Sequence, residues 1–406
     1  MHDVPTTGLS TARLTTDPYP LLASLRDRHP VWRVPRTDAF LVTSWDLVAE
    51  ATGRVDEFSN HFRHTIFTAG DGTMRVVDGG ESGAPDVFAG ADPPDHTAHR
   101  RLFFPELVQA RMRELEPVVA ARTDVLLDEA LASGRFDAAT ALADPLPLRI
   151  MAEDVMGLRD VDVGWLQARV DAGSHVMGGR RSLDGIATAA EDAAALWPWV
   201  ADQLDEARRS RRSDGVLGPA AAAVSDGGLD PNEAVFTLIV LLGAGAETTT
   251  SLIGNAVRLV AEHGELQDRL RSRLELVPTY VEEVLRVESP FRFHPRLVRG
   301  PTTLGDVELP DRAMLLLMWS SANRDGEVFE DPDTVVVGRP NAHLHLGFGR
   351  GIHHCVGAPL ARLETRVVLE RLLERTGHVE LDPTDAPTNV DSIWINRHEH
   401  LPVATS

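Results

Sequence analysis

The chain has 406 residues, 43% of them hydrophobic and 25% charged, and its formal net charge is −21 at pH 7. This composition is that of a globular protein with a sizeable core, and the acidic balance argues against nucleic acid as a partner. The single cysteine rules out an internal disulfide, and no basic or apolar leader and no apolar run of about eighteen residues is present, so we expect a cytoplasmic protein without a membrane anchor.

The N-terminal quarter shows mixed signals. Residues 1–17 are expected to form a loosely ordered tail, and apolar residues at helical spacing predict a helix over 19–28. Two short apolar runs, 31–34 and 40–43, predict a β-hairpin. The stretch 68–92 contains six glycines among aspartates, which is typical of a long, mobile surface loop.

Helical periodicity dominates the rest of the chain, and short β signals return only late. We expect strands near 303–309 and 314–318. The predicted helices span 95–130, 140–157, 162–177, 184–212, 232–262, 265–275 and 277–288. Because no linker separates these elements, the sequence predicts one mainly α domain with small β-sheets over residues 1–406.

Cys355 lies in a glycine-rich stretch, 347–359, that leads into an amphipathic run. The three glycines within 347–351 allow positive φ and a close approach of the backbone to a flat partner. The following run predicts a helix, so the sulfur is expected at a positive helix end, where thiolate is favoured over thiol. Cys355 is therefore a candidate metal ligand.

Two other interpretations of Cys355 compete. A lone cysteine is most often a small buried hydrophobe, although the glycine pattern favours a ligand. Zinc is the second alternative, because four histidines crowd around the cysteine: His343, His345, His353 and His354. Structural zinc sites usually carry two ligand pairs at short spacings, and this chain has no second cysteine to supply one.

The pattern Phe348-Gly349-x-Gly351-x-His353-x-Cys355-x-Gly357 resembles the cysteine-ligand loop of the cytochrome P450 family. The resemblance implies the P450 fold, a mainly α, triangular-prism-like domain. Haem b would be buried between an oxygen-binding helix and the cysteine-loop helix, next to Phe348 and with Cys355 as its axial ligand. It also implies a haem-thiolate monooxygenase, since a thiolate ligand donates electron density that favours O–O cleavage.

The long apolar helix expected around 238–259 contains glycines and threonines over 243–250. Taken alone, this cluster indicates close packing, with Glu247 facing solvent. In the family, the matching segment is a kinked oxygen-binding groove. The resemblance makes Glu247 and Thr248 its acid–alcohol pair, with Ala244 and Gly245 beside the haem, and implies that O2 is the oxidant.

Further family motifs can be matched. Glu283-x-x-Arg286 is a common exposed pair when taken alone, but it resembles the family's Glu-x-x-Arg pair, whose third member would be Arg339 in a buried structural network. The spacing of His96 and Arg100 places both on one helix face. In the family, matching residues bind the haem propionates, and they correspond here to His96, Arg100, Arg296 and His353.

The resemblance also places the substrate pocket. Besides Ala244, its walls would come from Phe62, Ile66, Val240, Phe291, Phe293, His294 and Trp394, which suggests a small hydrophobic substrate, with the loop 68–92 closing over it. Two stretches depart from the family pattern. Ser320-Ser321 replaces small apolar residues, and 396–402 replaces a glycine-leucine segment; we interpret the second as a change at the surface.

Electrons must come from a partner, because no dinucleotide fingerprint and no cysteine set for an iron–sulfur cluster is present. By analogy with the family, a ferredoxin would dock on the face near the thiolate, which would carry Arg100, Arg101, Arg111, Arg113, Arg350 and Arg362. Desaturation and oxidative coupling share every motif named. A haem-based gas or ligand sensor is a further alternative, but it needs no acid–alcohol pair.

Overall fold

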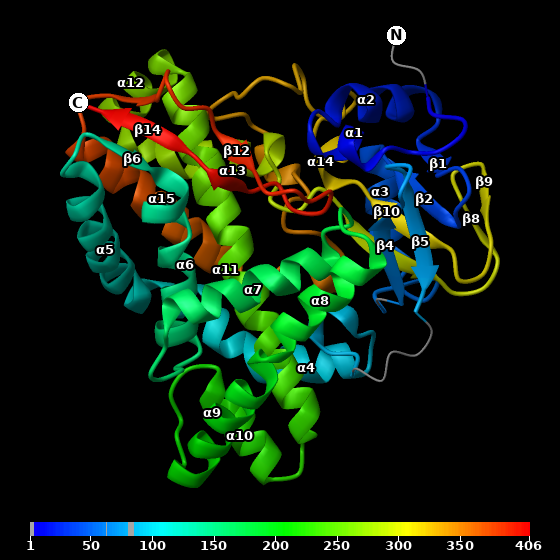
Figure 1. Cartoon of the computed structure of the whole chain (residues 1–406), viewed down its shortest axis with the longest axis horizontal. Coiled ribbons are helices and arrows are strands. Elements are labelled where there is room, and N and C mark those ends of the chain that lie inside the picture. The colour runs from blue at the N-terminus through cyan, green and yellow to red at the C-terminus, as the bar shows by residue number, and fades with distance from the viewer. Residues whose placement is uncertain (1–3, 62, 80–84) are drawn as a thin grey trace.

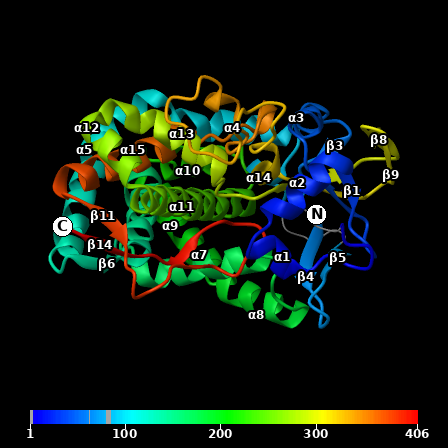
Figure 2. The same cartoon turned by 90° about the horizontal axis from the view of Figure 1, so that it is seen from above.

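A computed structural model describes residues 4–61, 63–79 and 85–406. A helix of 32 residues, α11 (Pro231–Glu262), runs through the centre of the molecule (Figures 1 and 2). The side chain of Asp230 accepts hydrogen bonds from the backbone N–H groups of Asn232 and Glu233, and Pro231 occupies the first turn. This arrangement satisfies two free amides and fixes where the helix begins.

The other helices pack around α11 or cover the sheets. Those before it are α1 (Thr11–Thr15), α2 (Tyr19–Arg28), α3 (Trp45–Gly53), α4 (Asp95–Phe103), α5 (Gln109–Leu131), α6 (Pro145–Arg149), α7 (Val163–Met177), α8 (Leu183–Ala194), α9 (Leu196–Ser210) and α10 (Leu217–Ser225). Those after it are α12 (Gly264–Ser272), α13 (Val277–Val287), α14 (Trp319–Ala322) and α15 (Ala358–Arg375).

A five-stranded sheet lies on the opposite side of the molecule from α5 and α12 (Figure 1). Its order is β1 (Val31–Arg33), β2 (Ala39–Val42), β10 (Met314–Leu317), β7 (His294–Val298) and β3 (Phe58–Ser59). The β1–β2 hairpin confirms the sequence prediction, and β10 runs parallel to β2 with Met314 opposite Ala39. All four residues of β2 and of β10 are buried, as expected for a central position.

The remaining strands form small units. A three-stranded sheet contains β11 (Val379–Leu381), β14 (Pro402–Thr405) and β6 (Arg135–Asp137). Three antiparallel pairs are β4 (His64–Thr68) with β5 (Met74–Asp78), β8 (Thr302–Leu304) with β9 (Val307–Leu309), and β12 (Thr388–Asn389) with β13 (His398–His400). The mainly α prediction with small sheets is confirmed.

The expectation of a loose N-terminal tail is wrong for the residues described there. Helix α1 forms, and both Leu9 and Leu14 are at most 1% exposed in a cluster with Met74. Burial of two leucine side chains contributes about 3–6 kcal/mol before the entropy of ordering is counted. The segment is therefore anchored through apolar contacts. Its helix is too short to show a helical pattern in the sequence.

The prediction of a continuous loop over 68–92 is also wrong in its first half. Residues 64–78 form the hairpin β4–β5, which turns at Gly72 with φ +75°. Met74 is buried against the N-terminal cluster, so the strand has one apolar face despite the glycines around it. Residues 85–92 contain a single 3₁₀ turn, Phe88–Gly90.

Two predicted helices are divided. The span 95–130 breaks into α4 and α5 through a 3₁₀ turn at Phe104–Leu107, because Pro105 cannot donate a backbone hydrogen bond. The span 184–212 breaks between α8 and α9 at Ala195. The span 140–157 contains α6 between two π-helical turns, Ala139–Ala143 and Ile150–Val155. Helix α10 was not predicted.

Helix α11 is the one described helix that is long and apolar enough to span a membrane by composition. However, 61% of its most apolar window is buried inside the protein, as in the core helix of a globular fold. Its apolar character is accounted for by packing against α15, α6, α9 and α7.

Candidate active site

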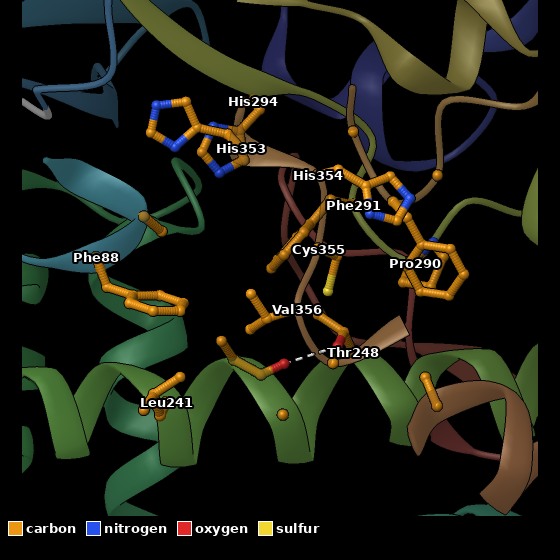
Figure 3. Close-up of a pocket in the computed structure, with 18 of the residues that line it drawn as sticks. Phe88, Leu241, Thr248, Pro290, Phe291, His294, His353, His354, Cys355 and Val356 are labelled. Carbon is orange, nitrogen blue, oxygen red and sulfur yellow. Dashed lines mark hydrogen bonds between the residues drawn. The ribbon is translucent and has the colours of Figure 1, made fainter. Parts of the chain in front are cut away.

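A cavity of about 1320 Å³, part of it open to solvent, lies between α11 and the loop that precedes α15. Figure 3 shows the sulfur of Cys355 pointing toward α11, with Thr248 on the helix that faces it. Ala244 and Gly245, one turn before Thr248, also line the cavity. The structure thus brings the cysteine loop and the predicted oxygen-binding segment to opposite walls of one space.

The glycines of the cysteine loop have the roles that the sequence indicated. Gly349 and Gly351 adopt positive φ values of 66° and 72°. A Cβ atom on Gly347 would lie 3.0 Å from the backbone oxygen of Leu285, so that position requires a close approach. The N–H of Cys355 donates to the oxygen of Phe348 at 2.9 Å, which closes the loop and aims the sulfur into the cavity.

The helix end acts on Cys355 as predicted, but desolvation by the surrounding protein has the larger effect on its pKa. The surrounding protein raises the pKa of the Cys355 thiol, while hydrogen bonds from the N–H groups of Gly357 and Ala358 and the charges of Arg100 and Arg362 lower it. The expectation that the helix end alone favours thiolate is therefore incomplete. Coordination to a metal ion deprotonates a thiol outright. Ligation would therefore lower the pKa of Cys355 further, in the same direction as the backbone amides.

Two arginines and two histidines form one rim of the cavity, and Asp92 lies near Arg296 and His96 without lining the cavity. The rings of His96 and His353 are 4.1 Å apart, and His96 Nδ1 and His353 Nε2 are buried without a hydrogen-bond partner. Burial lowers the pKa of Arg296 to about 10. Among the described residues that line the cavity, none is acidic.

Arg100 completes this rim. Its guanidinium donates to the backbone oxygens of Ile352 and His354, at 3.2 and 2.9 Å, and so ties α4 to the cysteine loop. Two guanidiniums and two partnerless imidazoles around an apolar cavity fit a flat ligand that carries two carboxylates. All four predicted propionate-binding residues are brought together here.

Helix α11 is α-helical throughout the predicted oxygen-binding segment. The Thr248 hydroxyl donates to the oxygen of Ala244 at 2.7 Å (Figure 3). This i to i−4 bond keeps the hydroxyl at the cavity wall. At Gly245 a Cβ atom would lie 2.9 Å from the sulfur of Met151, so the small residue is required by packing.

Glu247 is buried and does not line the cavity, so its interpretation as a solvent-facing residue is wrong. Burial raises the pKa of Glu247 to about 7, against a hydrogen bond from Ser174 and the charge of Arg397. The nearest guanidinium nitrogen of Arg397 lies 3.9 Å from Glu247 Oε1. A carboxyl group with this pKa can hold or release a proton near neutral pH.

Glu283, Arg286 and Arg339 meet in the interior. Arg286 donates to both carboxylate oxygens of Glu283 at 2.8 and 3.0 Å, and Arg339 Nε approaches the same carboxylate at 3.1 Å. Glu283 and Arg286 are fully buried. Arg286 also donates to the backbone oxygens of Asn323 and Thr334, so the network fixes the segment before the cysteine loop.

The predicted substrate residues divide between two cavities. Val240, Phe291 and His294 line the main cavity. Ile66, Phe293 and Trp394 instead line an adjacent cavity of about 530 Å³ that shares Arg296 with it. Trp394 stacks on Phe291 with 4.3 Å between ring centroids, so this aromatic pair lies where the two cavities meet. Phe62 lies outside the described residues.

Sequence reasoning missed several apolar side chains of the main cavity, among them Phe88, Leu107, Met151 and Leu241. Leu241 follows Val240 in α11 and could have been found from its helical position. Phe88 comes from the segment interpreted as loop, and its φ of +45° turns the chain toward the cavity. Met151 lies in a π-helical turn, which sequence periodicity does not reveal.

The second departure from the family pattern is not at the surface, contrary to our interpretation. Asn396, Arg397 and His398 are 7%, 7% and 5% exposed, and the Asn396 amide donates to Glu288 Oε2 at 2.7 Å. Their burial could not be predicted from hydrophobicity, because these side chains are polar. The serines of the first departure are buried as well: Ser320 donates to the oxygen of Arg292, and Ser321 accepts from Arg26.

Comparison with known proteins identifies the family. The cytochrome P450 family model matches residues 202–395. Cytochrome P450 144 of Mycobacterium tuberculosis is 36% identical over 97% of this chain and 90% of its own length. The chain belongs to the cytochrome P450 family.

Two further relatives agree. Erythromycin C-12 hydroxylase of Saccharopolyspora erythraea is 33% identical over 94% of this chain and 93% of its own length. The crystal structure of CYP109E1 from Bacillus megaterium in complex with testosterone superposes with a TM-score of 0.86 at 26% identity, covering 98% of this chain and all of that one. The P450 fold is thereby confirmed.

As a cytochrome P450, the chain binds haem b through the thiolate of Cys355. The cavity fits this cofactor, because two partnerless imidazole nitrogens and the guanidiniums of Arg100 and Arg296 match two propionates, and its walls are otherwise mainly apolar. The histidines that suggested zinc have other surroundings: His345 contacts Glu282 at 3.1 Å, and His353 packs on His96. No three potential metal ligands converge within the described parts of the chain.

Proposed function

We propose that this P450 is a cytoplasmic, ferredoxin-dependent monooxygenase that acts as one domain and inserts an oxygen atom from O2 into a small hydrophobic molecule. The observation that carries the proposal is the arrangement of Cys355 and Thr248 on facing walls of a single cavity. Haem held there supplies oxygen activation, since a thiolate ligand favours O–O cleavage. The residues of the chain bind, orient and deliver protons.

His96, Arg100, Arg296 and His353 would hold the propionates through charge-assisted hydrogen bonds. Neutralisation of two carboxylates by this rim offsets the cost of burying them. Arg100 contributes twice, because it also contacts the backbone of the cysteine loop at His354.

Thr248 and Glu247 are proposed to supply protons to the cavity. The Thr248 hydroxyl is at the wall, and Glu247, the adjacent residue, has a pKa of about 7 and is buried behind it. A general acid is most effective when its pKa lies near the working pH. This pair is the reason to propose turnover rather than ligand sensing.

The lining indicates the class of substrate. Apolar side chains, among them Phe88, Val240 and Phe291, dominate the part of the cavity away from the propionate rim. Small-molecule sites with apolar walls usually bury most of the surface of their ligand. A compact apolar molecule is therefore proposed.

Electrons are proposed to enter from a ferredoxin at a groove of about 720 Å³ formed by α5, α13 and α15. Arg113, Arg362 and Arg366 line this groove, next to the cysteine-loop helix. Two of the three are paired: Arg362 bonds Glu282 at 2.6 Å, and Arg366 bonds Glu116 at 2.6 Å. Arg113 is exposed.

The test has two arms. Reduction of the purified protein under carbon monoxide is expected to give the absorption band of thiolate-ligated haem, and Cys355→Ala is expected to lose it. A library screened for the spin-state shift on ligand binding then supplies a substrate for turnover with a surrogate ferredoxin and its reductase. A hydroxylated product supports the proposal. A desaturated or coupled product, or ligand binding without any product, contradicts it.

A further inference from the structure

Arg397 brings the segment that departs from the family pattern next to the buried acid of α11. The Arg397 side chain is 8% exposed. Its Nη1 lies 2.7 Å from Asp171 Oδ1 on α7 and 3.9 Å from Glu247 Oε1, and its Nε lies 3.7 Å from Asp144 Oδ1. One guanidinium therefore faces three carboxyl groups that come from three different parts of the chain.

The charges of this cluster do not balance. His175 on α7 also faces it, but burial lowers the pKa of that imidazole, so it does not add a cation near neutral pH. Arg181 and Glu399 add one positive and one negative charge beside His175, and these two charges offset each other. One guanidinium faces three carboxyl groups, of which Glu247 is buried while Asp144 and Asp171 are partly exposed. Part of the cluster therefore stays protonated near pH 7. Burial accordingly raises the pKa of Asp144 to about 6.

Not every nitrogen of the Arg397 guanidinium has a hydrogen-bond partner. Its Nε and the Oδ1 atom of Asp144 are both buried without a hydrogen-bond partner. Its short contact is to Asp171, whose side chain is 32% exposed and reaches solvent. Glu247 and Asp171 thus compete for one guanidinium, and only Asp171 is in hydrogen-bond range.

We propose that Arg397 is a positioning residue that sets the protonation and placement of Glu247, and that Asp171 tunes it by competing for the same guanidinium. The inference rests on the proposed function. A proton that Glu247 gives to the cavity by way of Thr248 is replaced from solvent on the side of Asp171. Arg397 keeps all of its protons, because a guanidinium does not deprotonate in proteins.

Opposite shifts in two variants provide the test. In the ferric holoenzyme, infrared spectroscopy follows the C=O stretch of protonated Glu247, assigned as the band that Glu247→Gln removes. Arg397→Gln takes away a cation and is expected to raise the midpoint of this band by about one pH unit or more. Asp171→Asn takes away an anion and frees Arg397 for Glu247, so the midpoint is expected to fall.

The pH profile of kcat provides a second readout, and its alkaline limb should move in the same direction as the infrared midpoint in each variant. Arg397→Lys keeps the charge and is expected to restore the midpoint. The matched control is Arg258→Gln, which removes an arginine of α11 that pairs with Glu262 and Glu288 and should leave the Glu247 band unmoved.

The two proposals fail in different ways. If the wild type shows thiolate-ligated haem but forms no oxygenated product, the proposed function is wrong. If the wild type turns over and the midpoint stays fixed, or moves in the same direction in Arg397→Gln and Asp171→Asn, Arg397 is only structural and the inference is overturned. Retention of the Soret band in each variant shows that the comparison is made on folded holoenzyme.

Discussion

The Thr248 hydroxyl lies at the cavity wall, where it can affect how much product is formed per electron pair consumed. Its oxygen is held by the Ala244 carbonyl at 2.7 Å, so it faces the cavity without needing a partner from the substrate. Replacement by alanine removes no buried partner other than a carbonyl that stays within a helix. Stability should therefore change little.

We expect Thr248→Ala to lower product formed per electron pair several-fold, with the surplus appearing as hydrogen peroxide or water, because proton delivery in the cavity loses its hydroxyl. The measurement compares cofactor consumed with product and peroxide formed. Thr248→Ser restores the hydroxyl and should recover much of the coupling. Unchanged coupling in the alanine variant would show that Thr248 has no role in proton delivery.

Individual site residues could be predicted from the sequence where the chemistry allows only one or two residue types at a position. Cys355, the propionate-binding set and Thr248 all line the cavity as expected, since their motifs constrain both identity and position. Arg397 was missed because nothing in its own neighbourhood marks it. Its proposed role depends on contacts with residues far away in the sequence, such as Asp171, which lies more than two hundred residues before it.

Among the structural elements, α13 is held to the cysteine-loop side of the molecule by the Glu283 network. Glu283 accepts from Arg286, Arg339 and the backbone N–H of Val336. Replacing Glu283 with glutamine leaves two buried guanidiniums without their anion. Breaking a buried pair in this way costs about 3–5 kcal/mol.

The expected result for Glu283→Gln is poor haem incorporation and a lower free energy of unfolding, measured by urea titration followed at the Soret band and by far-UV circular dichroism. Glu262→Gln is the matched control, because Glu262 pairs with Arg258 at a partly exposed position and should cost about 1 kcal/mol or less. Equal losses in the two variants would contradict a special role for the buried network.

Strand β13 carries a pH-sensitive contact. His400 Nδ1 and Nε2 lie 2.8 Å from Asp137 and Asp385 respectively, and these hydrogen bonds raise the pKa of His400. A histidine whose folded-state pKa is raised contributes its full stability below the unfolded value of about 6.5 and loses that contribution as pH rises through the folded-state pKa.

The stabilising difference between the wild type and His400→Gln should therefore be present at about pH 6 and vanish by about pH 9. Because the contact is partly exposed, the difference in Tm at the lower pH is expected to be only about 1 °C. Thermal scans at several pH values measure it. A difference that grows with pH would reverse the sign and exclude the contact as its source.

Elements were predicted well where periodicity was strong and poorly where tertiary contacts decide. Helix α2 and the β1–β2 hairpin follow their sequence patterns closely. The hairpin β4–β5 was hidden by glycines, and its strand is stabilised by the burial of Met74 against α1 rather than by local propensity. Breaks such as that at Ala195 depend on packing and carry no strong local signal.

For the molecule as a whole, the balance of charge matters most at the groove beside the cysteine loop. The chain is strongly acidic, with a net charge of −21, yet arginines outnumber acidic residues in this groove: Arg113, Arg362 and Arg366 line it with Glu116 and Glu282. A small acidic partner would be repelled by most of the surface and attracted there. Such steering acts on association and weakens as salt screens it.

We expect Arg113→Glu to raise the KM for ferredoxin about tenfold at low ionic strength while kcat at saturating ferredoxin stays near the wild-type value. The ratio of the two KM values should shrink as salt increases, because the Debye length falls to about 8 Å at physiological ionic strength. Arg209→Glu is the matched control, since it makes the same charge change at an exposed position on α9, far from α15 in Figure 1. If both variants raise KM equally, the effect follows from net charge alone and the groove is not the docking site.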